Sequence, residues 1–208
     1  SGSGGLTKRG NGHLTLDAAA HSYTGATVVM GGTLEVNGLG ASSVTIGTAG
    51  RLLTHGSLGS TVDNAGMLQL DPAVAGAVAL AGDYRHGSTA SLGLQVGDRL
   101  EVSGQAQLYG GALHITGKRD FVSAGQQHTV LHAVAGLSGT FSQITQPSTL
   151  FVDAQLSYSA NAVDLLLNRL DVLTVAATLG TPTPASLASA QRIEHAFTAI
   201  DDDLRQPT

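Results

Sequence analysis

The sequence contains no cysteine and no tryptophan, and only 12% of its residues are charged. The absence of cysteine excludes a disulfide framework, a thiolate metal site and a cysteine nucleophile. Ten basic residues stand against fifteen acidic ones without forming a cluster, so we expect no nucleic-acid partner. Stability must therefore come mainly from packing, for which 208 residues provide a sizeable core.

Long apolar runs are also missing. The most apolar stretches, such as residues 163–173, are short and interrupted by charged residues, whereas a membrane-spanning helix needs about 20 consecutive apolar residues. The start of the sequence does not show the pattern of a secretory signal peptide. We therefore expect neither a membrane helix nor an amino-terminal signal sequence in this chain.

Glycine is abundant but unevenly placed. Of 28 glycines, 27 lie between Gly2 and Gly139, and only Gly180 follows them. The glycine-rich regime is also rich in Thr, Ser, Val and Leu, a composition typical of short strands broken by turns. From about Asp171 the chain becomes rich in Ala and Leu.

A repeat runs through the glycine-rich regime. Units of alternating apolar and polar residues begin at Gly12, Gly32, Gly50 and Gly66, which are 20, 18 and 16 residues apart. In a strand such alternation puts the leucines on one face, and a single strand cannot bury that face. If the chain coils once per period, the units stack in parallel and their leucines form a continuous core.

This geometry is an all-β fold, a right-handed parallel β-helix. An antiparallel β-sandwich is the alternative, because it also shows short alternating strands with glycine turns. The nearly fixed offset and the scarcity of aromatics favour the coil. After residue 98 the pattern changes, and three of the four phenylalanines and two of the four tyrosines lie between Tyr109 and Tyr158. These larger side chains predict a hairpin-built cap with a better filled core.

Three motifs near the amino end follow one another in a fixed order. They are Lys-x-Gly-x-Gly-x-Leu at 8–14, Tyr-Thr-Gly at 23–25 and Gly-Thr-Leu at 32–34. This order resembles the passenger-associated transport repeat of bacterial autotransporters, the type V secretion proteins. His13 and His21 depart from the small polar residues more usual there. Four downstream segments are similar to the autochaperone region that ends such passengers, at 98–117, 125–131, 139–141 and 156–167.

The resemblance implies a division of the chain. Residues 1–4 are a linker or an expression scar, 5–97 a β-helix stem, 98–169 an autochaperone-like β cap, and 170–208 a linker with an α-helix at about 186–200. The implied partner is the chain's own outer-membrane β-barrel, which these 208 residues do not contain. The implied location is the surface or surroundings of a Gram-negative bacterium.

The residues themselves also support the helix. Ser186 follows Pro184 and can cap the first turn, while three consecutive aspartates at 201–203 oppose the helix dipole and predict fraying from about Ile200. Whether this helix packs on its own domain or threads the barrel pore stays open. One face is apolar, formed by Leu187, Ala190, Ile193, Phe197, Ile200 and Leu204.

The sequence matches known catalytic motifs only incompletely. The nearest Gly-x-Ser-x-Gly, at 136–140, ends in threonine. His55 and His86 echo the histidine box of subtilisin-like proteases in two residues only, and the serine box does not occur. Asp83 precedes His86 on an expected turn, with no partner serine implied. We therefore interpret His86 as a surface turn residue and predict no catalytic residue.

Metal and cofactor patterns are equally incomplete. His128 and His132 lie four apart, but Thr129 stands where a zincin needs glutamate. On a strand they share a face at about 13 Å, too far apart for one ion, so we interpret them as surface residues. Gly38-Leu39-Gly40 is followed by Ser43 instead of a third glycine. We predict no metal and no cofactor.

The expected function is a non-catalytic stem and folding template of a secreted passenger, which assists translocation and display. One alternative is an adhesin or binding module that contacts a host surface through Thr, Ser and Asn ladders. Another is the stem of a subtilisin-like serine protease whose catalytic residues lie upstream. A saccharide-cleaving face is not expected, because aromatics are few and the acidic residues are scattered.

Overall fold

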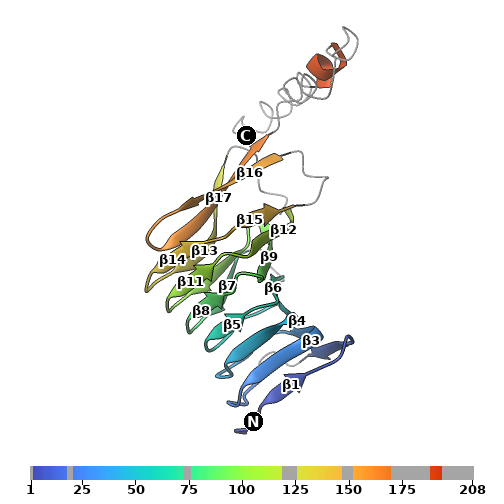
Figure 1. The fold of residues 1–208 in the computed structure, drawn as a ribbon, viewed down its shortest axis with the longest axis vertical. Helices are drawn as coiled ribbons and strands as arrows, with labels where there is room; N and C mark the ends of the chain where they lie inside the picture. The colour runs from blue at the N-terminus through green and yellow to red at the C-terminus, as the bar shows by residue number, and fades with distance from the viewer. Residues whose placement is uncertain are drawn as a thin grey trace, which may run out of the picture.

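A computed structural model describes residues 2–17, 21–72, 76–118, 126–146, 152–169 and 188–193. The chain winds into a stack of coils from the amino terminus upward, with strands lying across the long axis (Figure 1). Each coil places short strands in up to three columns, and each strand pairs in parallel with the equivalent strand of the next coil. The fold is a parallel β-solenoid, as the repeat predicts, and the antiparallel sandwich is excluded.

Two columns belong to one 12-stranded sheet that bends at a corner. The first column runs through β1 (Leu6–Lys8), β3 (Thr27–Val36), β4 (Val44–Thr54), β5 (Val62–Asn64), β8 (Tyr84–His86), β11 (Ala106–Tyr109) and β14 (Leu137–Thr140). The second runs through β2 (His13–Leu16), the later halves of β3 and β4, β6 (Met67–Leu70), β9 (Ser91–Val96), β12 (Ala112–Lys118) and β15 (Gln143–Thr145).

The third column begins as single bridges between His21, Leu39, Leu58 and Leu80. It then continues as a five-stranded sheet. Its strands are β7 (Ala77–Leu80), β10 (Arg99–Val102), β13 (Gln127–Ala133), β17 (Ala162–Arg169) and β16 (Val152–Tyr158).

The glycine-led units stack as their spacing predicts. His13 lies beside Thr33, Thr33 beside Arg51, and Arg51 beside Met67. The leucine two positions after each glycine therefore lies beside the corresponding leucine of the next coil. Apart from the half-exposed first member, the leucines of this row are completely buried: Leu34, Leu52, Leu68, Leu92 and Leu113. The core of the solenoid is therefore a continuous column of aliphatic side chains.

Corner glycines let neighbouring coils approach closely. Gly32 has a φ of +66°, and a Cβ there would lie 2.3 Å from the carbonyl oxygen of Gly12 on the preceding coil. A left-handed conformation and a backbone atom in the place of Cβ both require glycine. This explains why glycine opens the unit at position 32.

The carboxy-terminal cap is built on a hairpin, as predicted. β17 pairs antiparallel with both β13 and β16, and it turns Val163, Leu165 and Leu167 into the core. The predicted aromatic filling is wrong in part, because Tyr109 is 62% exposed and Tyr158 is 37% exposed. Tyr109 occupies an outward position of β11, whereas Tyr158 lies on the same face as Val163 but at the end of the edge strand β16, so the cap core is mainly aliphatic.

A helix occupies residues 188–193, inside the span predicted at 186–200. The rest of the predicted helix lies outside the described residues. Within the described part of the chain, no helix is both long and apolar enough to cross a membrane. The predicted domain boundaries remain predictions.

Candidate functional site

The first motif of the repeat places a lysine inside the fold. Lys8 on β1 is buried, and its Nζ donates hydrogen bonds to the carbonyls of Arg9 at 3.0 Å, Gly10 at 2.8 Å and Gly31 at 3.0 Å. Two of these carbonyls follow β1, whereas the third belongs to the next coil. The ammonium therefore ties two successive coils together at their corner.

The second motif forms a chain of hydroxyl groups. Tyr23 Oη lies 2.7 Å from Thr27 Oγ1, which lies 2.7 Å from Ser42 Oγ, and Ser42 donates to the carbonyl of Gly25 at 2.7 Å. Thr27 and Ser42 are both buried. A Cβ on Gly25 would lie 2.5 Å from the carbonyl of Gly4, so the motif needs glycine there. The Tyr-Thr-Gly segment thus fixes one corner across neighbouring coils.

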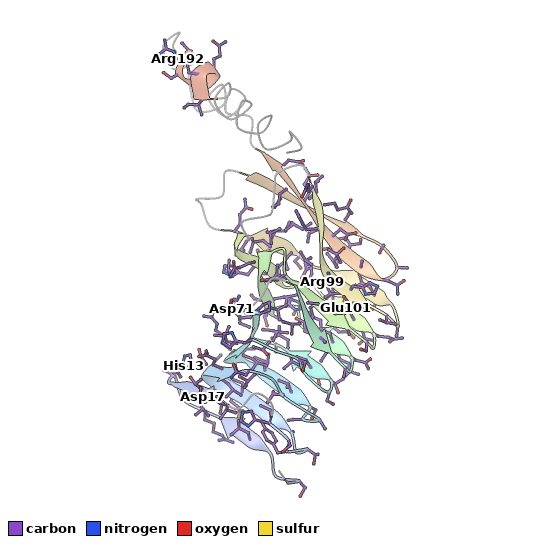
Figure 2. The ribbon with its side chains drawn as sticks, turned by 180° about the vertical axis from the view of Figure 1, so that it is seen from behind. His13, Asp17, Asp71, Arg99, Glu101 and Arg192 are labelled. Carbon is purple, nitrogen blue, oxygen red and sulfur yellow. The ribbon has the colours of Figure 1, made fainter. Side chains whose placement is uncertain are left out.

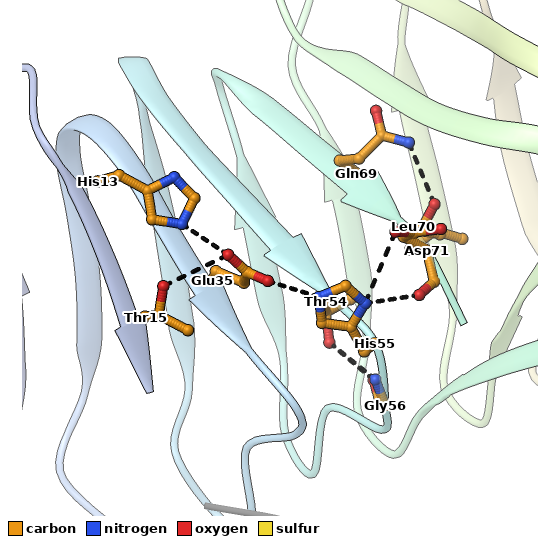
Figure 3. Close-up of polar contacts among 9 residues, drawn as sticks. All are labelled: His13, Thr15, Glu35, Thr54, His55, Gly56, Gln69, Leu70 and Asp71. Atoms are coloured by element: carbon orange, nitrogen blue, oxygen red, sulfur yellow. Dashed lines mark hydrogen bonds and ion pairs between the residues drawn. The ribbon is translucent and has the colours of Figure 1, made fainter. Parts of the chain in front are cut away.

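A row of histidine and carboxylate side chains runs over the outside of the second column. His13, Glu35, His55 and Asp71 come from four successive coils and line up side by side (Figure 3). Glu35 Oε2 lies 2.6 Å from His13 Nε2, and its Oε1 lies 2.9 Å from His55 Nε2. His55 Nδ1 in turn lies 2.8 Å from the carbonyl oxygen of Asp71. We call these four residues the imidazole–carboxylate row.

The row is electrostatically coupled. Hydrogen bonds from His55 and then His13 lower the pKa of Glu35, and the hydrogen bond to Glu35 raises the pKa of His55. The sequence analysis singled out His13 only as a departure from the repeat and His55 only as an incomplete protease motif. Coiling is what brings the four together, because they lie far apart in sequence.

The interpretation of His86 as a surface turn residue is wrong. His86 ends strand β8 and is completely buried, with a hydrogen bond of 2.8 Å between its Nδ1 and Tyr84 Oη. The Phe141 ring packs edge-on against the imidazole, with centroids 5.0 Å apart. Burial lowers the pKa of His86 to about 4, although a hydrogen bond with the Ala90 backbone has a weaker, opposite effect. The low pKa keeps the imidazole neutral.

Asn64 extends this buried polar group into the neighbouring coil. Its Nδ2 donates to Tyr84 Oη at 3.3 Å and to the carbonyl of Ser91 at 3.0 Å, and its Oδ1 accepts from the amide of Gly66 at 3.1 Å. Strand register is what could have revealed this network, because Asn64 on β5 lies beside His86 on β8 in the parallel pairing. A polar residue at an inward position pairs with another polar residue on the next coil.

His128 and His132 do not share a face of the strand, contrary to the sequence-based expectation. β13 bulges between Thr129 and Leu131, so His128 pairs with the buried Leu165, whereas His132 pairs with Ala162 on the outside. The extra residue of a bulge reverses the alternation.

His132 instead meets a carboxylate on the adjacent strand. Its Nδ1 bonds to Glu101, which also accepts from Arg99 Nε at 3.0 Å; Arg99 and Glu101 lie on β10 (Figure 2). Burial would raise the pKa of Glu101, but the hydrogen bonds from His132 and Arg99 outweigh it and lower the pKa. Among the described residues, no group of three or more His, Asp or Glu side chains could hold a metal ion.

The fold and the repeat define a class of protein. It is a parallel β-solenoid in which a repeated sequence motif joins successive coils at their corners. Residues 6–36 match the family model described as the passenger-associated-transport-repeat. The match covers the lysine, the tyrosine–threonine–glycine segment and the Gly-Thr-Leu unit described above.

Two kinds of relatives support this assignment. The chain is 32% identical over 123 residues to the autotransporter lipoprotein NalP of Neisseria meningitidis serogroup B, covering 57% of this chain and 11% of the relative. It is 29% identical over 185 residues to an extracellular serine protease of Serratia marcescens, covering 82% of this chain and 17% of the relative. The chain thus spans less than a fifth of either relative's length. The repeat match and both relatives support an autotransporter passenger region that is exported through the Gram-negative outer membrane to the surface or the medium.

Proposed function

We propose that this chain is the non-catalytic stem of its passenger, and that the cap, residues 98–169, is the folding template for the coils before it. The partner in this role is the outer-membrane β-barrel of the same parent protein. The observation that carries the proposal is the hairpin of β16 and β17. β16 and β17 are consecutive in the chain, pair antiparallel and are joined directly by a short turn.

Short-range pairing forms without the entropy cost of closing a long loop. Between β16 and β17 only the turn around Ser159 intervenes, and Ser159 N donates to the carbonyl of Ala162 at 2.9 Å. The same turn is bonded to the coil below it, because Asn161 Nδ2 donates to the carbonyl of Ala133 at 2.8 Å. A hairpin that forms early can therefore present β17 as an edge on which β13 and the earlier coils assemble.

Coil addition supplies a driving force for export. Each new coil buries a leucine of the central row together with its neighbours, and full burial of one such side chain is worth about 1.5 to 3 kcal/mol. If the carboxyl end emerges first, each coil that folds outside prevents the chain from sliding back. Outward movement then needs no nucleotide hydrolysis.

The substitution Leu113→Asp tests the template role. Leu113 on β12 is completely buried and lies between Leu92 and Ile144 in register, so a carboxylate there costs several kcal/mol. We expect loss of refolding of the isolated chain, followed by circular dichroism, and loss of surface display of the full-length parent. Thr116→Asp on the exposed face of the same strand is the control and should change neither. Survival of both folding and display in Leu113→Asp would refute the template role.

A second candidate concerns the parent protein. Similarity to an extracellular serine protease favours a parent with a protease upstream of this chain, so that the chain would act as its stem. A fluorophosphonate probe should label the full-length parent and leave the isolated chain unlabelled. Labelling of the isolated chain would contradict the non-catalytic assignment.

A further inference from the structure

The outer face of the first column carries a shallow groove of about 290 Å³ that crosses four coils. Its floor consists of residues with no side chain or a small one, and its sides carry an aromatic ring and an ion pair. The floor residues are Gly47, Ala65 and Gly87, and the side residues are Asp63, Arg85 and Tyr109.

The floor is a column along the solenoid axis. Ile46, Asn64, His86 and Leu108 lie beside one another in register, so the residues that follow them form the next column outward. That next column reads Gly47, Ala65, Gly87, Tyr109. Three small residues in a row, ended by a tyrosine, leave a trough against the tyrosine ring.

The fold does not require glycine at position 47 of this floor. A Cβ on Gly47 would find its nearest heavy atoms at 3.5 Å, which is ordinary packing, and its φ is not positive. By contrast, a Cβ on Gly50, three residues later on the same strand, would lie 2.2 Å from the carbonyl oxygen of Val29. Gly50 is therefore explained by coil packing, whereas Gly47 is explained by keeping the trough open.

The sides of the trough are chemically mixed. The Tyr109 ring is 62% exposed, and its hydroxyl donates to Gln107 Oε1 at 3.1 Å, so the ring is held in place while its faces stay accessible. Arg85 Nη1 lies 3.2 Å from Asp63 Oδ1, and half of each side chain is exposed. The rim thus offers a donor and an acceptor side by side without net charge.

We propose that this trough binds a neutral saccharide chain. One face of a pyranose ring carries C–H groups that stack on tyrosine and on a flat apolar floor, while its hydroxyls both donate and accept hydrogen bonds. Asp63 is the acceptor for those hydroxyls, and Arg85 is the donor. An acidic sugar would compete with Asp63 for Arg85, so a neutral one is preferred. Because coils repeat every ~4.8 Å, a linear saccharide laid along the axis meets the same kind of floor at the three successive coils that carry Gly47, Ala65 and Gly87.

The test uses the purified chain, an array of neutral glycans, and NMR titration with cellohexaose and maltohexaose. Saccharide binding should shift the amide signals of Gly47, Ala65, Gly87 and Tyr109. We expect Gly47→Thr, which fills the trough, and Tyr109→Ala, which removes the ring, each to weaken binding at least tenfold. Tyr109→Phe keeps the stacking face and should retain binding.

Val134→Thr, at another exposed apolar residue, is the matched control and should leave affinity unchanged. If Gly47→Thr does not fold, Tyr109→Ala decides alone, because that ring is exposed and its removal leaves the core intact. The proposal is overturned if no neutral glycan binds, if binding survives both substitutions, or if only sialylated glycans or peptides occupy the trough. None of these outcomes affects the template role, which is read from refolding and display.

Discussion

The two ends of the solenoid hold together in different ways. The first coils are joined by parallel pairing and by polar groups at the corners, such as Lys8 with its three carbonyls and the chain from Tyr23 to Ser42. The cap is closed by an antiparallel hairpin whose inward face is aliphatic. A coil in the stem depends on its neighbours, whereas the hairpin also has local pairing of its own. If folding begins at the hairpin, the two ends should respond differently to the same kind of substitution.

The largest expected effect comes from one charge placed at either end. Leu165→Asp in β17 and Leu34→Asp in β3 both put a carboxylate at a completely buried position, at a cost of several kcal/mol each. If the hairpin is the template, Leu165→Asp abolishes folding of every coil, whereas Leu34→Asp unfolds only the first coils. Amide hydrogen exchange of β9 and β10 separates the two outcomes. Equal loss of protection in both variants would mean that the stem folds without a preferred end.

Acidification should destabilise the middle of the molecule through His86. Its pKa in the folded protein, about 4, lies below the ordinary value of 6.5. Between these pH values the imidazole is protonated in the unfolded chain but not in the folded one. This contribution is complete above pH 6.5 and is lost as the pH falls toward 4, about 3 kcal/mol in all. Urea unfolding at pH 7.5 and pH 4.5 measures it. His86→Met should flatten this dependence, and an unchanged slope in that variant would refute the assignment.

Gly25→Ala tests the corner of the transport repeat. The added Cβ would lie 2.5 Å from the Gly4 backbone, and overpacking of this kind costs about 1 to 3 kcal/mol. Because the contact joins only the first two coils, the loss of exchange protection should be confined to β1 and β2. Gly12→Ala is the control, since a Cβ there meets nothing within 4 Å. Equal effects of the two variants would show that glycine matters for flexibility and not for contact.

The smallest effect is expected from the imidazole–carboxylate row. Because the pKa of His55 is raised, its contribution is present below pH 6.5 and is lost as the pH rises through the folded pKa. Because the pKa of Glu35 is lowered, its contribution is present above pH 4.5 and is lost on acidification. His55→Gln should therefore lower stability most between these values and less at pH 8. The effect should shrink in high salt, since the groups are partly exposed. A loss of stability that does not depend on pH would mean that His55 contributes through packing and not through its ion pair.

The sequence predicts the parts of this fold that repeat. The Gly-x-Leu units fix the register of the second column, because a leucine two positions after each corner can be buried only if the coils align. The switch to a hairpin is also visible, in the two adjacent alternating segments at 152–158 and 162–169. These features depend on local alternation and on spacing, which a single sequence displays.

What the sequence does not show is set by partners on other coils. His86 looks like a turn residue until its register beside Asn64 turns it inward. The bulge in β13 reverses His132 relative to His128 without any glycine or proline to mark it. The burial of Lys8 depends on a carbonyl of Gly31 from the following coil. In each case the deciding atom lies a full coil away.

The direction of the hydrogen bonds has a mechanical consequence. The strands lie across the long axis, so the backbone hydrogen bonds between coils run along it (Figure 1). A pull on the two ends therefore loads the pairings one after another instead of sharing the load among them. The force that opens the solenoid is set by its weakest junction and does not grow with the number of coils. A stem of this kind can lengthen its reach without becoming harder to unwind.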